Sequence, residues 1–320
     1  MTEKIKYPKN CIKVLDCGFV GLINSLGSDT TITNSARVSY GDGTKKSSNN
    51  KTLIRHLIRN KHTSPFEHVI FTFHVKAPIF IFRQWHRHRC WSYSEISGRY
   101  SVLPEECYVP DEENVTTQDP DNKQGGTDTQ VPFNRKKLEE DWEDSCGFYP
   151  EYVGDGWSSV FEHEQFNLKK HYNSYIESGM RRELARINQP VSQYSEMYAT
   201  VDLHNLFHFL KLRMDKHAQW EIRQYANALF ELIKPIVPEA CQAFEDYILN
   251  SITLTKLDIE ALQEFLHYNL SGSWGCLEND PEMIECETKE IRNKHFSNKR
   301  EEKEFIEKLK ILLAEVKSGL

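Results

Sequence analysis

The chain has 320 residues, of which 39% are hydrophobic and 27% are charged, as is typical of a globular protein with one large domain or two smaller ones. Its formal net charge of −7 argues against a protein that coats nucleic acid or a membrane surface, although it allows one local basic pocket. The longest apolar run, residues 77–82, is too short to span a bilayer, and residues 1–10 lack the apolar centre of a secretory signal. A cytoplasmic protein is therefore expected.

The eight cysteines include no Cys-x-x-Cys pair. This spacing fits neither a zinc ribbon nor a small disulfide scaffold. In a reducing compartment, we expect them to be free thiols.

The N-terminal part of the chain predicts strands and short helices in turn. Residues 11–26 suggest a strand and a turn, because glycines interrupt an apolar run there. A stripe of apolar residues predicts a helix over 52–60, and the β-branched and aromatic residues of 69–75 predict a strand. Pro78 suits the first turn of a second helix, which is expected to run to about Arg89.

A polar segment follows. Residues 111–130 contain almost no apolar side chains, so they have little to bury in exchange for the entropy lost on ordering. We expect a long surface loop or a disordered insertion there.

Helical patterns dominate the second half of the chain. Gly179 is expected to end one helix, and Asp202 to cap another that buries Leu203, Leu206, Phe207 and Leu210. Other predicted helices cover 161–178, 182–187 and 219–233, and two more lie in 251–320, the last over 299–318. Early strands and late helices favour the α+β class, with a mainly antiparallel sheet flanked by helices and a helical C-terminal half.

Residues 83–100 concentrate groups that suit an anionic nucleotide. This segment holds four arginines, two histidines, three serines and a glutamate. Guanidinium groups bind phosphates and ring carbonyls as planar forks, and tryptophan and tyrosine offer stacking faces. Ser97 and Gly98 provide a hydroxyl and an unshielded backbone N–H, which allow a phosphate to approach closely.

Three alternatives compete with a nucleotide pocket. The segment could be a solvated basic turn, or its arginines could pair with acids elsewhere in the chain. His86 and His88 have the spacing of a metal-binding pair, but clustered cations oppose a divalent ion and no nearby Asp or Cys completes a set, so no metal is expected. RNA binding is disfavoured by the acidic chain.

The order of charged residues in this segment resembles a family signature. Arg87, His88 and Arg89 are followed after seven residues by Ser97, which is similar to the signature of the flavin-dependent thymidylate synthases. Further elements similar to those of the family occur in the expected order: Asp16 with Gly18-Phe19-Val20, Ala36-Arg37-Val38-Ser39, 62–68, 183–186 and 212–221. The resemblance covers residues 11–250, so we expect a synthase domain over 1–250, with a polar insertion at about 111–160, and a helical extension over 251–320.

The resemblance implies reductive methylation of dUMP to dTMP. The one-carbon donor would be 5,10-methylenetetrahydrofolate, and FAD reduced by NADPH would supply the hydride, so that tetrahydrofolate is released. It also implies a homotetramer with active sites between subunits and an FAD site without a Rossmann fingerprint. An alternative function is a flavin-dependent NADPH oxidase or reductase that binds nucleotide incidentally; a second is a nucleotide- or RNA-binding module without catalysis.

Residue roles carry over by position in the motifs. The residues expected to contact FAD are Ser39, His62, Ser64, Arg87, His88, Arg89, Glu95, Asp202, His204 and His208. The residues expected to surround dUMP are Gln84, Trp85, His86, Arg87, Glu95, Ile96, Ser97, Gly98, Arg99, Arg186 and Arg213. The chain departs from an Asn-x-Arg pattern of some family members at Asp202-x-His204, where Asp202 could serve only as a helix cap.

Arg213 is expected to be the catalytic residue. Held near the pyrimidine, its guanidinium would stabilise the negative charge that develops when the ring loses its N3 proton. Ser97 is expected to bind the substrate phosphate rather than to act as a nucleophile, and Cys90 to be a structural thiol, because this chemistry needs no cysteine.

Overall fold

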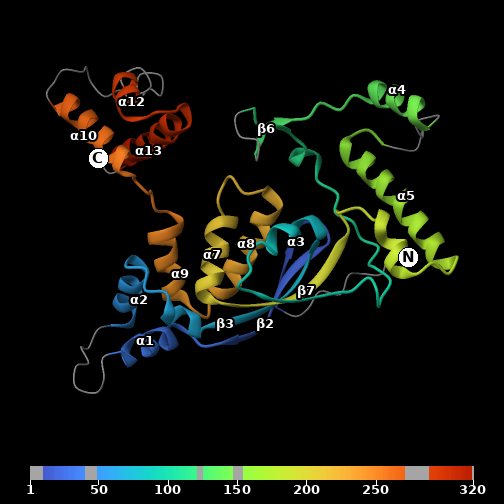
Figure 1. The fold of residues 1–320 in the computed structure, drawn as a ribbon, viewed down its shortest axis with the longest axis horizontal. Helices are drawn as coiled ribbons and strands as arrows, with labels where there is room; N and C mark the ends of the chain where they lie inside the picture. Colours follow the sequence, from blue (N-terminus) through green and yellow to red (C-terminus); the bar gives the residue numbers. More distant parts are fainter. Residues whose placement is uncertain (1–9, 40–48, 121–124, 147–153, 271–287, 319–320) are drawn as a thin grey trace. The chain divides into compact units, whose positions relative to one another are not determined.

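A computed structural model describes residues 10–39, 49–120, 125–146, 154–270 and 288–318. The chain divides into two compact units, Met1–Leu249 and Asn250–Leu320. Each has its own apolar core, and Figure 1 shows the elements of both. None of the helices in the described ranges is long and apolar enough to cross a membrane.

The first unit is built on a five-stranded sheet in which every neighbouring pair is antiparallel. The strand order is β1-β2-β3-β7-β4. The strands are β1 Cys11–Val14, β2 Gly18–Leu26, β3 Ile70–Pro78, β7 Tyr194–Asp202 and β4 Ser92–Glu95. The mixed architecture with an antiparallel sheet is thus confirmed.

Strand β7 is the main element that the sequence analysis missed. It pairs with β3 from Ile70↔Asp202 to Pro78↔Tyr194, so it is a central strand in a half of the chain that was predicted to be helical. Its buried residues alternate, as expected for a strand with one face against a core: Ser195, Met197, Ala199 and Val201. That two-residue period was a readable signal, and it was overlooked among the neighbouring helical patterns.

Helices cover one face of the sheet. Alternate residues of β3 and β7 pack with the apolar faces of α7 and α8, which lie on the same side of the sheet in Figure 1. The helices that contribute to the same core are α1 Asp29–Val38, α2 Asn50–Arg59, α7 Leu203–Arg213, α8 Trp220–Ile233 and α9 Pro238–Phe244. The helices predicted over 52–60, from Asp202 and over 219–233 are confirmed, and Pro238 stands in the first turn of a further helix, α9.

The opposite face of the sheet is more polar. His74 bonds Glu196 at 2.8 Å, and the hydroxyls of Thr72 and Thr200 meet at 3.0 Å. Tyr198 lies on this face with 47% of its surface exposed.

Residues 11–26 form two strands instead of one. The β1–β2 hairpin turns through Leu15, whose φ of +58° is unusual for a bulky residue. Gly18 follows directly, and a Cβ there would lie 2.1 Å from the Tyr225 hydroxyl. The hairpin therefore packs against α8 at a distance that only glycine allows.

The helix predicted from Pro78 to about Arg89 is shorter than expected. Pro78 is the last residue of β3, and α3 spans only Ile79–Trp85. The Tyr93 hydroxyl lies 3.3 Å from the Trp85 carbonyl and 2.9 Å from the His88 carbonyl. These bonds satisfy carbonyls that a longer helix would have used, and the chain turns inward at His88.

The polar insertion is more ordered than predicted. Its described residues form a 3₁₀ turn, η2, and a two-stranded sheet, so a loop or disordered segment over 111–130 is wrong for them. Residues 121–124 lie outside the described part. Pairing replaces burial as the source of order, since the hydroxyls of Thr117 and Thr127 bond across the strands at 2.6 Å. The elements are η2 Glu112–Asn114, β5 Thr116–Gln118, β6 Gly126–Gln130, α4 Arg135–Cys146 and α5 Trp157–Glu177.

Helix α5 begins before the predicted residue 161. The indole of Trp157 donates to the Val131 carbonyl at 3.2 Å and packs on Phe133, which anchors the first turn. Gly179, with φ of +80°, ends the helix as predicted. Two short turns follow, α6 Arg182–Ala185 and η3 Arg186–Asn188.

The described part of the second unit contains three helices, one more than predicted. They are α10 Lys256–Leu270, α12 Lys289–His295 and α13 Lys299–Ser318. The last coincides with the predicted helix. Its Phe305 and Leu309 pack with Ala261, Phe265, Ile291 and Phe296, so this apolar stripe closes a core within the unit.

Candidate functional site

A cavity of about 530 Å³ lies between α3, the end of β4, the start of β7 and η3. Six residues predicted to surround dUMP line it: His86, Glu95, Ile96, Ser97, Gly98 and Arg186. Arg83, from the same motif, lies there as well. The sequence analysis missed two further lining residues, Ser195 at the start of the unrecognised strand β7 and Gln193 just before it.

One part of this cavity is strongly basic. Arg83 and Arg186 line it, and among the described residues neither forms an ion pair or a hydrogen bond through its guanidinium. Gly98 is buried beside them, and a Cβ there would lie 3.0 Å from Cδ and from Nη1 of Arg186. Guanidinium groups without an ion pair, beside a glycine and the Ser97 hydroxyl, suit a phosphate. This arrangement argues against arginines that merely pair with acids elsewhere.

Glu95 supplies a carboxylate to the same cavity. Its Oε1 accepts a hydrogen bond of 2.8 Å from Oγ of Ser195, whose side chain is buried. The carboxylate is thus attached to the sheet by a hydroxyl rather than by a cation.

Two buried polar atoms on the cavity residues have no hydrogen-bond partner among the described residues. They are Nε2 of His86 and Oε1 of Gln193. Buried polar atoms in proteins are nearly always bonded to protein, water or ligand. Both atoms therefore mark positions where a bound molecule or an ordered water is expected.

Arg213 lies in a second group of predicted residues. Its Nε donates to Nε2 of His88 at 3.1 Å, and its Nη2 donates to the Gln84 carbonyl at 3.3 Å. The Gln84 side chain in turn donates to Oε1 of Gln219. These contacts fix the direction of the guanidinium.

His88 is neutral at physiological pH. Burial, with further contributions from Arg213 and His208, lowers the pKa of its imidazole to about 4. Because Nε2 accepts from Arg213, the single ring proton is assigned to Nδ1. His88 therefore orients Arg213, a role that the motif alone did not predict.

A third group gathers at the far end of β3 and β7. Ser64 opens the 3₁₀ helix η1 Ser64–His68, which packs on α7 through Phe66 and Phe207. Asp202 caps α7 as predicted, accepting from the backbone N–H of Asn205 at 2.9 Å. His204 and His208 follow one turn apart on α7, and the His208 ring lies 5.8 Å from that of His88.

Other predicted residues lie outside these groups. Ser39 is exposed at the C-terminus of α1, and His62 is exposed before η1 with its ring 6.0 Å from that of His56. Arg99 is exposed and lies 3.4 Å from Glu183, whereas exposed Arg87 and Arg89 have no acidic partner among the described residues.

Trp85, predicted to lie around dUMP, is a core residue and is not among those that line the cavity. Its ring is fully buried and packs on Trp91, Phe209 and Tyr225. The ring therefore supports the motif from the core instead of facing a ligand. Cys90, expected to be structural, is an exposed free thiol.

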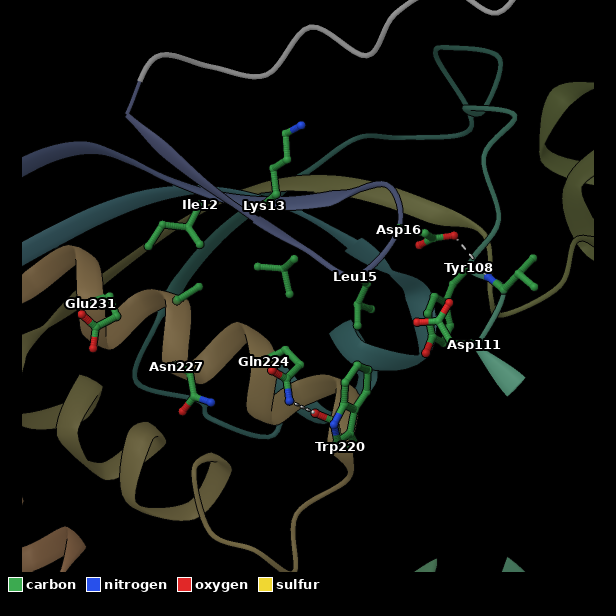
Figure 2. A pocket seen from close by; sticks show the side chains of 13 residues that line it. Ile12, Lys13, Leu15, Asp16, Tyr108, Asp111, Trp220, Gln224, Asn227 and Glu231 are labelled. Atoms are coloured by element: carbon green, nitrogen blue, oxygen red, sulfur yellow. Dashed lines mark hydrogen bonds between the residues drawn. The ribbon is translucent and has the colours of Figure 1, made fainter. Parts of the chain in front are cut away.

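A different cavity, of about 500 Å³, lies between the β1–β2 turn and α8 (Figure 2). It contains none of the residues predicted to bind dUMP or FAD. Asp16 at its edge accepts from the backbone N–H of Cys17 and Val109 and from the Tyr194 hydroxyl. Burial raises the pKa of Tyr194, which keeps this hydroxyl a neutral donor. Asp16 therefore has a structural task, tying the hairpin turn to β7.

Within the described ranges, no three His, Cys, Asp or Glu side chains lie close enough together to hold a metal ion. The side chains of His86 and His88 lie at different sites. The first lines the cavity beside Glu95, and the second turns to Arg213.

The family described as thymidylate synthase complementing protein matches residues 21–239, which lie within the first structural unit. The chain belongs to this family. The membership predicted from the Arg87–Ser97 motif is thereby confirmed.

Curated relatives in the family carry the name flavin-dependent thymidylate synthase. The one from Treponema denticola is 45% identical over 82% of this chain and 92% of its own length. The one from Dictyostelium discoideum is 46% identical over 79% of both chains, and one from Thermus thermophilus is 44% identical over 80% of this chain and 86% of its own.

Solved structures extend the likeness to the fold. A UMP/dUMP methylase, PolB from Streptomyces cacaoi, bound with 5-Br UMP, is 30% identical with a TM-score of 0.58. The match covers 75% of this chain and all of that one. The same methylase bound with 5-Br dUMP matches equally well in TM-score, at 29% identity.

Proposed function

We propose that this protein is a flavin-dependent thymidylate synthase that methylates C5 of dUMP. The one-carbon unit comes from 5,10-methylenetetrahydrofolate, the hydride from FAD reduced by NADPH, and tetrahydrofolate is released. The observation that carries the proposal is the cavity where Arg83, Arg186, Ser97, Gly98 and Glu95 meet in a chain that belongs to this family.

The basic part of the cavity receives the dUMP phosphate. Arg83 and Arg186 provide positive charge and form no ion pair among the described residues, although Glu95 and Glu183 also line the cavity, and Ser97 adds a hydroxyl donor. The absence of a Cβ at Gly98 leaves the Arg186 side chain in place beside it.

Arg213 acts on the pyrimidine. His88 and the Gln84 carbonyl occupy two of its five donor positions and leave the others for a ring oxygen of the substrate. Negative charge that builds on the uracil when N3 loses its proton then meets a guanidinium that is already oriented. Burial lowers the pKa of Arg213, but a guanidinium stays protonated at neutral pH.

The residues present fit FAD. The exposed guanidiniums of Arg87 and Arg89, unpaired among the described residues, suit its diphosphate, and His62, Ser64, His204 and His208 would bind the rest of it. Asp202 contributes through α7, as its cap. The described strands pair only antiparallel and form no Rossmann crossover, which supports a flavin site of a different type. When bound and reduced, FAD supplies the hydride that completes the methyl group.

We also propose a homotetramer with active sites between subunits. Arg213 is not among the residues that line the cavity of the other predicted dUMP ligands, and it contacts His88, which lies beside His208 of the proposed FAD group. A neighbouring chain would complete each site by joining these two parts. The partly exposed sheet face with Tyr198 offers surface for such contacts.

We assign catalysis to the first unit, place the enzyme in the cytoplasm with its nucleotide substrates, and propose neither a metal nor a nucleic-acid partner.

The test is tritium release from dUMP labelled at C5, with FAD, NADPH and methylenetetrahydrofolate each omitted in turn. Release that requires the reduced flavin and the folate supports the synthase. NADPH oxidation that is indifferent to dUMP, without tritium release, would overturn it in favour of an oxidase. A protein that retains no flavin and binds RNA with a steep salt dependence would point to a binding module.

A further inference from the structure

Ser195 and Glu95 are brought together by the register of β4 and β7. Glu95, the last residue of β4, lies opposite Met197, and Ser195 lies two residues before Met197 in β7. Residues two apart share a face of a strand, so Ser195, Met197 and Glu95 project to the same side of the sheet. On that side the Glu95 carboxylate lies beside the Ser195 hydroxyl, and both residues line the cavity.

The Glu95 carboxylate is held by one short hydrogen bond from Ser195. Oγ of Ser195 donates to Oε1 of Glu95 at 2.8 Å, and only 3% of Ser195 is exposed. No lysine, arginine or histidine among the described residues forms an ion pair with Glu95. A glutamate side chain has three rotatable torsions, so without this bond several directions would be open to the carboxylate.

The donor itself is held in place. Ser195 pairs with Ala77 on β3, and the neighbouring Tyr194 donates to Asp16 from the other face of the strand. Because both faces of β7 are anchored here, Ser195 cannot follow a carboxylate that turns away. One hydrogen bond takes one of about four acceptor positions on Glu95, which leaves its other oxygen for a ligand.

We propose that Ser195 is a positioning residue that holds the Glu95 carboxylate in the direction needed to bind dUMP. The inference rests on the proposed function for the identity of the ligand. It adds a residue that lies outside the motif segment 83–100 and acts through Glu95.

The proposal is tested by calorimetry, which measures the affinity of the FAD-loaded enzyme for dUMP. Loss of a hydrogen bond to a charged group predicts that Ser195→Ala weakens dUMP binding by about 10- to 100-fold. Ser195→Thr, which keeps the hydroxyl, should restore binding to within about threefold of the wild type. Ser94→Ala is the matched control, since Ser94 is exposed on the same strand beside Glu95 and faces the opposite way.

A double-mutant cycle separates positioning from a general structural effect. If Ser195 acts through Glu95, then Ser195→Ala in a Glu95→Ala background should weaken dUMP binding by less than about twofold. A full additional loss in that background would overturn the proposal, as would equal losses in Ser195→Ala and Ser94→Ala.

Crystal structures of the wild-type and Ser195→Ala holoenzymes give a readout that needs no substrate. The Glu95 carboxylate should leave its wild-type position in the variant, and an unchanged position would overturn the proposal. These results are independent of the proposed function. If the wild type binds dUMP but releases no tritium, the proposed reaction is wrong, while the double-mutant cycle and the Glu95 position still decide the role of Ser195.

Discussion

Arg213 lies between His88 and the Gln84 carbonyl, and both contacts use its guanidinium as a rigid fork. A lysine at this position would keep a charge but lose the planar set of donors. We therefore expect Arg213→Lys to lower kcat in the tritium assay by at least about 100-fold, the usual loss when an oriented donor to developing charge is removed. Flavin absorbance of the purified variant should stay that of the wild type, and normal turnover would contradict the assigned role.

The low pKa of His88 predicts a specific dependence of stability on pH. Its pKa is about 4 in the folded protein and 6.5 in the unfolded chain, so both states are neutral well above pH 6.5. As the pH falls from 6.5 to 4, the unfolded chain takes up the proton first, and the folded state loses stability. The 2.5-unit difference corresponds to about 3 kcal/mol in the free energy of unfolding.

Urea denaturation at pH 7 and pH 4.5 checks this expectation. Other groups titrate in the same range, so the comparison is with His88→Gln, which cannot take up a proton. The variant should lose about 2–3 kcal/mol less than the wild type between the two pH values. Equal losses in both proteins would show that His88 is not held neutral by the fold.

A substitution at Gly98 tests whether the basic part of the cavity binds the phosphate of dUMP. An added Cβ would lie 3.0 Å from Cδ and Nη1 of Arg186, so Gly98→Ala should displace this guanidinium from its phosphate-binding position. We expect dUMP binding to weaken by about 10-fold, the value of one charge-assisted hydrogen bond. Deoxyuridine, which lacks the phosphate, is the control ligand, and an equal loss for both ligands would contradict the phosphate assignment.

At the scale of elements, α7 is the helix that carries Arg213, His204 and His208, and Asp202 caps it. Asp202→Ala removes the acceptor and should cost about 1 kcal/mol in the free energy of unfolding, whereas Asp202→Asn keeps an acceptor and should cost only a few tenths. Thermal and urea denaturation measure the difference. FAD affinity should be unchanged in Asp202→Asn, and a loss there would show that the carboxylate itself contacts the flavin.

Local sequence patterns predict most of the helices, but not where every helix ends or every strand lies. The apolar periods of α2, α7 and α13 identify these helices, because each buries one stripe against its own unit. The end of α3 did not follow from its sequence, since it depends on Tyr93, which returns on β4 to bond the Trp85 and His88 carbonyls.

At the scale of the whole molecule, the two units have separate cores and the family match ends at residue 239. A truncated chain of residues 1–249 should therefore fold, retain FAD and release tritium at a rate within a few-fold of the full chain. Tritium release and the unfolding temperature of both proteins are the measurements. Loss of activity with an intact fold would instead assign a catalytic or assembly role to Asn250–Leu320.

The sequence by itself determined the family, the class of ligand and most helices, because these depend on local order: a motif over 83–100, apolar periods and a capping aspartate. Only the tertiary structure decided which of those residues share a cavity. Ser195 and Glu95 are 100 positions apart, and Arg213 and His88 are 125 apart. Such pairs meet through the register of β7 with its neighbours and the packing of α7 on the sheet, and no local pattern specifies how distant segments align.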